Sequence, residues 1–322
     1  MTRPVYFDCD TGVDDALALA YLLASDEIEL VGIGTVSGNV SAEQAADNTL
    51  RLLALAGRAD VPVAVGEHNP LAGQFDGGAP NVHGANGLGG VAVPPAEVAP
   101  VAEAAANMLL RLSHQYDSRL EVIAVGPLTN LARALERDPL LPERVASVTV
   151  MGGAALAPGN ITPVAEANIG NDPEAARAVM DAAWPVTLVP LDTTMENTLE
   201  ETERLQMCEA GSALVRAIGR MLEHYFDFYV AEYGRRCSAL HDPLAAALAV
   251  GGIRARVVPS VPVEVDASRG PGRGQTICDL RGQRAGTVDR EGAHVRVVLQ
   301  TEEQLAPHLL ERLLRLPSSF AQ

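Results

Sequence analysis

Residues 4–25 read PVYFDCDTGVDDALALAYLLAS. The first part, 4–10, has the apolar character of a buried strand. The Ala- and Leu-rich part, 15–25, predicts a helix with Asp14 as its N-cap. Four carboxylates fall within eight residues where the two parts meet: Asp8, Asp10, Asp14 and Asp15. A buried strand that runs directly into a helix is the first half of a βαβ unit, so this stretch favours an α/β fold.

The same alternation of apolar strands and helices continues along the chain. Further strands are expected at 28–37, 61–66, 120–126, 145–153 and 185–192, and further helices at 41–57, 95–116, from about 128, and at 173–183. A Gly-, Pro- and Asn-rich loop fills 67–95. Continuous Val/Ile strands separated by helices predict an α/β protein with a mostly parallel central sheet and helices on both faces.

The C-terminal part has a different pattern. Short alternating strands around the turn RGPGRG within 254–300 predict a small antiparallel addition, and 302–316 predicts a closing amphipathic helix. No change of composition marks a linker, and no repeat of 20–50 residues is visible. We therefore expect one domain over residues 1–322.

Composition limits the classes of function. The chain of 322 residues is 48% hydrophobic, carries a net charge of −17 and contains no lysine. This balance argues against a nucleic-acid partner, because phosphate contacts need clustered basic side chains. The sequence shows neither a signal peptide nor a membrane-spanning stretch, and its four cysteines show no CxxC spacing. We expect a reduced, cytoplasmic protein without a membrane partner.

The four acids of the opening stretch predict a cation site. Ligands of parallel α/β sheets bind at the carboxyl ends of strands, where these acids gather. One helix N-terminus offers about half a positive charge, too little for four carboxylates, so a bound divalent cation is the simplest counter-charge. The alternative is that the acids are only helix caps and solvated loop charges. The EF-hand pattern fails, since Val13 and Leu19 stand at its sixth and twelfth positions.

A phosphatase is a second alternative. Asp8-Cys9-Asp10-Thr11 resembles the DxDxT motif of haloacid-dehalogenase-type phosphatases, in which the first Asp is the nucleophile and Mg²⁺ is bound. Those enzymes usually also have a lysine and a later GDxxxD-like pair, and neither is found in this sequence.

The complete opening motif, DCDTGVDDALAL, resembles the signature of the inosine–uridine-preferring nucleoside hydrolases. Later blocks resemble that family in its order: TVSGN (35–39), VHGANGLGG (82–90), VGPLTNLA (125–132), MGG (151–153), GNITPVAEANIGNDPEAA (159–176) and LHDPLA (240–245). Each block alone is weak, whereas the ordered set is highly specific. The resemblance implies a Rossmann-like nucleoside hydrolase fold and hydrolysis of the N-glycosidic bond of ribonucleosides to ribose and free base. A third alternative is a non-catalytic nucleoside- or ribose-binding protein that kept this fold.

The resemblance also implies residue roles. It implies a Ca²⁺ held by Asp10, Asp15, Asp242 and the main-chain carbonyl of Val125, with Asp8 bracing the site. Asp10 is then expected to be the base that takes the proton of the attacking water, and His241 the acid that protonates the departing base. The expected substrate-binding residues are Asp14, Asn39, His83, Met151, Asn160, Glu166, Asn168, Tyr225 and Tyr229. Family members are commonly homo-oligomers, so a homodimer or homotetramer is expected.

Two departures from the family pattern bear on the base. Ala167 stands where the family often has an aromatic residue, and the single tryptophan, Trp184, lies in a helix-to-strand connection that suggests packing. Purine-specific members hold the base between tryptophans. The expected preference is therefore non-specific or for pyrimidine nucleosides and inosine.

Overall fold

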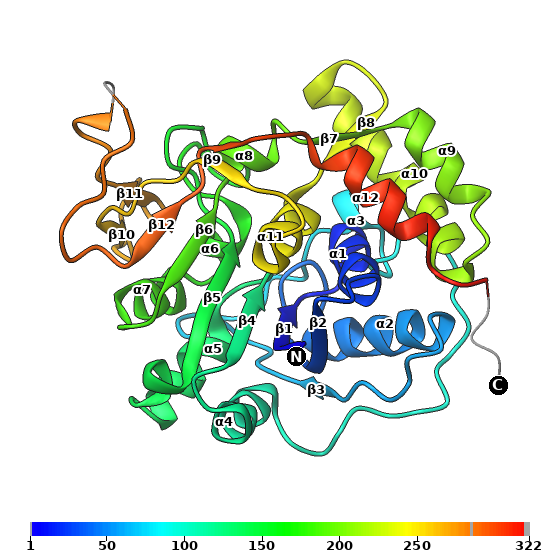
Figure 1. Ribbon diagram of the computed structural model, residues 1–322, viewed down its shortest axis with the longest axis horizontal. Coiled ribbons are helices and arrows are strands. Elements are labelled where there is room, and N and C mark those ends of the chain that lie inside the picture. Colours follow the sequence, from blue (N-terminus) through cyan, green and yellow to red (C-terminus); the bar gives the residue numbers. More distant parts are fainter. Residues whose placement is uncertain (1, 284–285, 319–322) are drawn as a thin grey trace.

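The computed structural model describes residues 2–283 and 286–318, and its centre is a parallel sheet. Seven strands of the described chain lie in the order β12-β6-β5-β4-β1-β2-β3, and every neighbouring pair is parallel. Figure 1 shows these strands running through the middle of the molecule with helices on both sides. The α/β prediction is confirmed.

The bounds of the elements are as follows. The strands of the central sheet are β1 (Arg3–Cys9), β2 (Ile28–Thr35), β3 (Val63–Val65), β4 (Leu120–Ala124), β5 (Val145–Met151), β6 (Val186–Val189) and β12 (Val295–Val297). The other strands are β7 (Thr198–Glu200), β8 (Cys237–Ala239), β9 (Ala255–Val257), β10 (Val263–Val265), β11 (Thr276–Cys278) and β13 (Gln300–Thr301). The first helices are α1 (Val13–Leu23), α2 (Ala42–Leu55), α3 (Pro80–His83), α4 (Ala105–Tyr116), α5 (Thr129–Arg137) and the 3₁₀ helix η1 (Leu141–Arg144). The later helices are α6 (Ala167–Asn171), α7 (Pro173–Asp181), α8 (Leu191–Thr194), α9 (Glu201–Cys208), α10 (Ala213–Tyr233), α11 (His241–Val250) and α12 (Leu305–Leu314).

The strand order creates a switch point beside β1. The chain builds outward from β1 to β2 and β3, then returns to place β4 on the other side of β1 and continues to β5 and β6. The loops that leave β1 and β4 therefore diverge at their carboxyl ends. Such a crevice is where open parallel sheets bind ligands.

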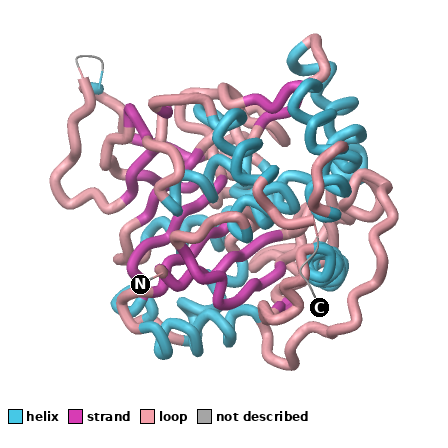
Figure 2. Tube along the Cα trace, turned by 45° about the vertical axis from the view of Figure 1, so that its right-hand side comes forward, coloured by secondary structure: helices cyan, strands magenta, loops and turns pink. Residues whose placement is uncertain are grey.

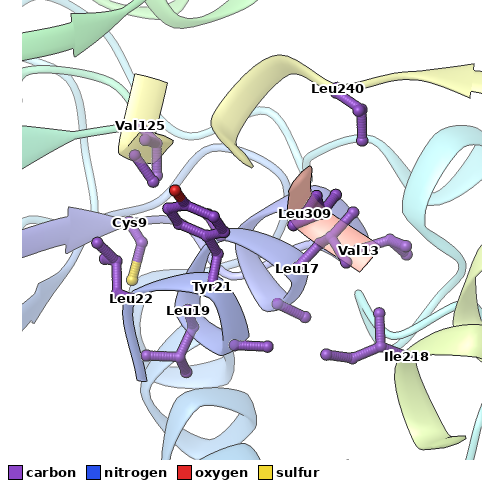
Figure 3. Packing of buried hydrophobic residues seen from close by; sticks show 14 of the residues in the cluster. Cys9, Val13, Leu17, Leu19, Tyr21, Leu22, Val125, Ile218, Leu240 and Leu309 are labelled. Carbon is purple, nitrogen blue, oxygen red and sulfur yellow. The ribbon is translucent and has the colours of Figure 1, made fainter. Parts of the chain in front are cut away.

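Strand alternation separates two cores. Val5, Phe7 and Cys9 of β1 belong to the core formed with α1, α10, α11 and α12, whereas Tyr6 belongs to the core formed with α4, α5 and α7. Figure 3 shows the first core, with side chains of α1 gathered beside Ile218 and Leu309. Figure 2, coloured by structure type, shows the strands enclosed by helices. Because successive strand residues face opposite sides, Asp8 follows Tyr6 toward α5.

The structure corrects two sequence expectations in the outer parts. The helix expected over 95–116 begins only at Ala105, because Pro100 interrupts it and Val101 instead forms a bridge with Ala64 of β3. The antiparallel addition exists as the pairs β10–β11 and β9–β13, but β12 from the same region joins the main sheet parallel to β6. An alternating pattern does not tell an edge strand of a parallel sheet from a hairpin strand.

The start of α1 also differs from the expectation. The helix begins at Val13 with Gly12 as N-cap, so Asp14 lies inside the first turn. Asp15 takes the capping role, because its Oδ2 accepts a hydrogen bond of 2.7 Å from the Gly12 amide. A carboxylate at the third helical position that reaches back to the cap is an ordinary way to satisfy a free amide. Because Asp15 and not Asp14 caps the helix, the Asp14 carboxylate is left to bond with other partners.

Candidate active site

The loop from Asp10 to Asp15 is folded around the Asp15 carboxylate. Asp15 Oδ1 accepts from the Asp10 amide at 3.1 Å, and Oδ2 accepts from the Gly12 amide and from Asn39 Nδ2. Glycine at position 12 lets these groups approach closely, since a Cβ there would lie 2.8 Å from Asn39 Nδ2 and closer still to His83 Nδ1, so both side chains would have to shift. The sequence DTGVDD is thereby fixed in one conformation that packs its acids together.

Asn39 joins this loop to the next strand. Its amide nitrogen donates to Asp10 Oδ2 at 2.7 Å, and its side-chain Nδ2 donates to Asp10 Oδ1 at 3.2 Å. Because the same Nδ2 also lies 3.1 Å from Asp15 Oδ2, one asparagine orients two carboxylates. The motifs DCDTGVDD and TVSGN, distant in the sequence, thus meet at the carboxyl ends of β1 and β2.

Asp242 completes the acidic cluster from the far end of the chain. It lies in the first turn of α11, and one ligand atom each from Asp14, Asp15 and Asp242 fall within 4.8 Å of one another. All three are buried. Burial and the neighbouring Asp14 raise the pKa of Asp242 and raise that of Asp15 to about 7, while burial and Asp15 raise the pKa of Asp10. Without a counter-charge, burial and repulsion between neighbouring acids favour the protonated forms of Asp10, Asp15 and Asp242.

The donor set fits a hard cation. Carboxylate oxygens are the ligands that Ca²⁺ and Mg²⁺ prefer, and spacings of this size suit ligands on one ion. No arginine pairs with these acids within residues 2–283 and 286–318, although arginines form many surface ion pairs. The N-termini of α1 and α11, the positive ends of their helix dipoles, lie at the cluster, but each supplies only about half a positive charge. A bound divalent cation remains the simplest way to keep the acids ionised.

Asp8 lies beside the cluster in a network of its own. Its carboxylate accepts from the Tyr6 hydroxyl at 2.9 Å and from Asn130 Nδ2 at 3.1 Å. Burial raises the pKa of Asp8 to about 7, against the lowering effect of these hydrogen bonds. Asn130 in α5 was not singled out from the sequence, although its place just after the strand 120–126 is a usable signal. An acid that is 1% exposed and held this way is poorly placed as an attacking nucleophile.

Glu166 and Asn168 lie at the N-terminus of the short helix α6. Glu166 accepts from the amides of Asn168, Ile169 and Gly153, and burial raises its pKa to about 7. Asn168 Nδ2 donates to the carbonyls of Val125 at 2.8 Å and Met151 at 3.1 Å. The chain segments that follow β4 and β5 are thereby tied together at the switch point. The Val125 carbonyl, expected as a metal ligand, keeps a second lone pair for that use.

Asn160 departs from the expectation of a buried amide. Its side chain is exposed, and its Oδ1 accepts from the amide of Ala167, next to Glu166. The spacing within GNITPVAEAN therefore places an amide beside Glu166 without burying it.

The tyrosines and histidines form the opposite wall. The Tyr225 hydroxyl donates to Asp14 Oδ2 at 2.9 Å, and the Tyr229 hydroxyl lies 2.6 Å from His241 Nε2. The rings of Tyr225 and Tyr229 meet edge to face at 5.0 Å. Burial lowers the pKa of His241 to about 4, so the ring is neutral near pH 7. Tyr225 and Tyr229, one turn apart on α10, therefore line the site.

His83 reaches the same wall from α3. Its Nδ1 accepts from the Val13 amide at 3.1 Å and lies 3.7 Å from Asp14 Oδ1. Its ring is 5.4 Å from that of Tyr225, and burial lowers its pKa. A neutral ring whose Nδ1 accepts carries its proton on Nε2. His83 thus donates through Nε2, whereas its Nδ1, the nitrogen nearer Asp14, accepts.

Comparison with known proteins supports the nucleoside hydrolase resemblance over nearly the whole chain. The family model "Inosine-uridine preferring nucleoside hydrolase" matches residues 5–306. The chain belongs to the inosine-uridine preferring nucleoside hydrolase family. It is 37% identical over 238 residues to Uridine nucleosidase 1 of Arabidopsis thaliana. The aligned region covers 74% of this chain and 71% of the relative. It is 36% identical over 248 residues to the pyrimidine-specific ribonucleoside hydrolase RihA of Salmonella paratyphi B, covering 77% and 79%.

A solved plant nucleoside hydrolase, the PpNRh1 enzyme, superimposes with a TM-score of 0.90 at 30% identity, covering 98% of this chain and 100% of that one. This nucleoside hydrolase is therefore an N-glycosyl hydrolase of ribonucleosides, with a buried acidic cluster that suits its metal-dependent family. The haloacid-dehalogenase-type alternative is wrong. Within the described residues, no helix is both long and apolar enough to cross a bilayer.

Proposed function

We propose that this nucleoside hydrolase is Ca²⁺-dependent and that Asp10, Asp15, Asp242 and the Val125 carbonyl hold the ion. The observation that carries the proposal is the meeting of buried, arginine-free carboxylates at the switch point of the sheet. Calcium accepts carboxylate, carbonyl and water ligands in flexible geometry, which this mixed donor set offers. Asp14 is one of the three acids whose ligand atoms lie within 4.8 Å of one another, so its carboxylate would also meet a ribose held beside the ion.

Asp10 is the general base of the proposed reaction. A bound cation would supply acidity to a water and an anchor for the ribose hydroxyls. Asp10 would accept the proton of the attacking water, because Asn39 holds its carboxylate from one side and fixes its direction. The buried negative charge around it would stabilise the oxocarbenium-like sugar of the transition state.

Ribose would lie between the acidic loop and α6. Asp14, Asn39, Glu166 and Asn168 offer carboxylates and amides that pair with several hydroxyls, and Asn160 and Met151 border them. Asp8 would brace the site through Asn130. On the other wall, His241 would protonate the departing base, with His83, Tyr225 and Tyr229 around it.

The proposed base preference is for pyrimidine nucleosides or inosine, or a broad preference including them. Both named relatives act on uridine or pyrimidine ribonucleosides by their names. The only tryptophan is 0% exposed and donates from Nε1 to the Val179 carbonyl in the core of the α4–α5–α7 face. It is thus unavailable for stacking on a purine. The four cysteines are free, which supports a cytoplasmic location, and we propose a single-domain homodimer or homotetramer on the family resemblance.

The test is ribose release from inosine, uridine, cytidine and adenosine, with and without a chelator and with Ca²⁺ added back. We expect turnover that disappears on chelation and returns with Ca²⁺. Asp10→Ala should lower kcat by more than about tenfold, given the usual 10²–10⁴-fold worth of general catalysis. Asp47→Asn, which removes a half-exposed acid paired with Arg51, is the control, and its kcat should equal that of the wild type. Turnover that persists in excess chelator would refute the proposed dependence on Ca²⁺.

A further inference from the structure

Thr194 makes a contact that the activity does not yet explain. It ends α8, the short helix that follows β6, and its Oγ1 lies 2.7 Å from Nδ1 of His241. The other ring nitrogen, Nε2, lies 2.6 Å from the Tyr229 hydroxyl. The imidazole is therefore held at both nitrogens, by a threonine on one side and a tyrosine on the other.

The direction of the first hydrogen bond follows from burial. Thr194 is 0% exposed, and within the described residues its hydroxyl has no hydrogen-bond partner other than His241. A buried hydroxyl that did not donate its proton would incur the full desolvation penalty of that donor. The hydroxyl therefore donates to Nδ1. A neutral imidazole that accepts at one nitrogen carries its proton on the other.

The other ring nitrogen faces a hydroxyl that can accept. The Tyr229 oxygen lies 2.6 Å from Nε2, and a hydroxyl oxygen accepts from an N–H. Thr194 is 0% exposed and Tyr229 is 7% exposed, so the Thr194 hydroxyl is the more completely enclosed of the two. An Nε2–H on His241 leaves Nδ1 to accept the Thr194 proton, whereas an Nδ1–H would leave that proton without an acceptor.

We propose that Thr194 is a positioning residue that holds His241 in its Nε2–H tautomer. The importance of this for catalysis rests on the proposed function, in which His241 protonates the departing base. A general acid must carry its proton on the nitrogen that faces the reaction. Nε2 faces the tyrosine wall beside Asp14, and Nδ1 faces the end of α8. Thr194 thus decides which nitrogen holds the transferable proton.

The adjacent threonine provides a matched control. Thr193 is also buried, at 1% exposure, and lies in the same short helix, but its hydroxyl donates to the Val298 carbonyl. Thr193→Val and Thr194→Val each remove one buried hydroxyl and add one methyl group. Both should lower the melting temperature, whereas only Thr194→Val should change the tautomer of His241. Thr194→Ser keeps the hydroxyl and should restore the wild-type tautomer.

The experiment measures tautomers directly. Protein with ¹⁵N-labelled histidine side chains is compared by NMR for the wild type, the three threonine variants and a His241→Asn variant that assigns the His241 signals. We expect a protonated Nε2 and an unprotonated Nδ1 in the wild type, in Thr193→Val and in Thr194→Ser. In Thr194→Val we expect the proportion of the Nε2–H form to fall by up to about tenfold, the net worth of one hydrogen bond.

Kinetics give the second readout. We expect Thr194→Val to lower kcat for uridine by up to about tenfold with little change in KM, because the lost interaction orients the acid and does not bind the sugar. A wild-type His241 with its proton on Nδ1 would overturn the proposal, even if no Thr194 variant folds. An unchanged tautomer in folded Thr194→Val would also overturn it. If the wild type released no ribose, the proposed function would fail while the tautomer measurement still decided the role of Thr194.

Discussion

Chelating the metal should make the stability of this protein fall as pH rises from 5 to 7.5. Buried carboxyls in the site have raised pKa values in the folded chain, and burial is the first cause for each. A carboxyl with a raised folded pKa binds more protons folded than unfolded between the two pKa values. Its contribution to the free energy of unfolding therefore decreases with pH across that window. The loss begins near the unfolded pKa and is complete above about pH 7.

Asp8 gives the magnitude. Its pKa rises from 3.8 to about 7, and it is fully buried. Linkage then predicts a fall of about 2.5 kcal/mol in the free energy of unfolding between pH 5 and pH 7.5 from this one carboxyl. With an unfolding entropy of about 2.1 cal/mol/K per residue over 322 residues, 1 kcal/mol corresponds to about 1.5 °C. The expected fall in melting temperature is thus about 4 °C for each such carboxyl.

Differential scanning fluorimetry in a chelator, at several pH values from 5 to 8, checks this. Adding Ca²⁺ should raise the melting temperature most at the high end, because a cation stabilises the ionised carboxylates of the cluster. Glu166→Gln removes one titrating carboxyl outside the proposed ligands and should reduce the pH slope by about one carboxyl's share. A chelated protein whose melting temperature stays constant or rises from pH 5 to 7.5 would refute the reasoning.

Three substitutions test the geometry. Gly12→Ala should lower kcat/KM by about a hundredfold, since the new methyl displaces His83 and Asn39, and steady-state kinetics near wild type would contradict this. Trp184→Phe should lower the free energy of unfolding in urea by about 1–3 kcal/mol through the lost bond to Val179, while a changed base preference would show that the indole reaches the substrate. Thr276→Val removes the hydroxyl that bonds both the amide and the carbonyl of Ala154, so it should raise KM for uridine severalfold, and an unchanged KM would exclude a role for β11 in the site.

Sequence periodicity predicted the centre of this fold because its strands are buried on both faces. Runs such as 120–126 and 145–153 admit few other interpretations, and β4 and β5 lie within them. The outer parts were harder to predict. Pro100 stops a helix that composition favoured, and β12 lies at the sheet edge, where alternation resembles that of a hairpin strand.

The acidic loop could be predicted as a site, but not the partners of each acid. Asp8, Asp14 and Asp15 are equivalent by spacing, and only the fold shows that they bond to Tyr6, Tyr225 and Gly12 respectively. Thr194 was missed because a threonine after a strand has no distinctive spacing. One signal was available, since residues that follow β6 must emerge at the same edge of the sheet as the acids.

The acids of the cluster are oriented before any ligand arrives. Asp15 is fixed by three donors, Asp10 by Asn39 and Asp14 by Tyr225, so these carboxylates cannot rotate freely to avoid one another. Holding like charges together in a buried place opposes folding, which the raised pKa values express. Because these side chains are already held in place, a cation that binds the cluster loses little free energy to ordering them. The same arrangement therefore favours tight cation binding and lowers the stability of the metal-free protein. A mutation that lets the carboxylates move apart should weaken cation binding and stabilise the metal-free protein.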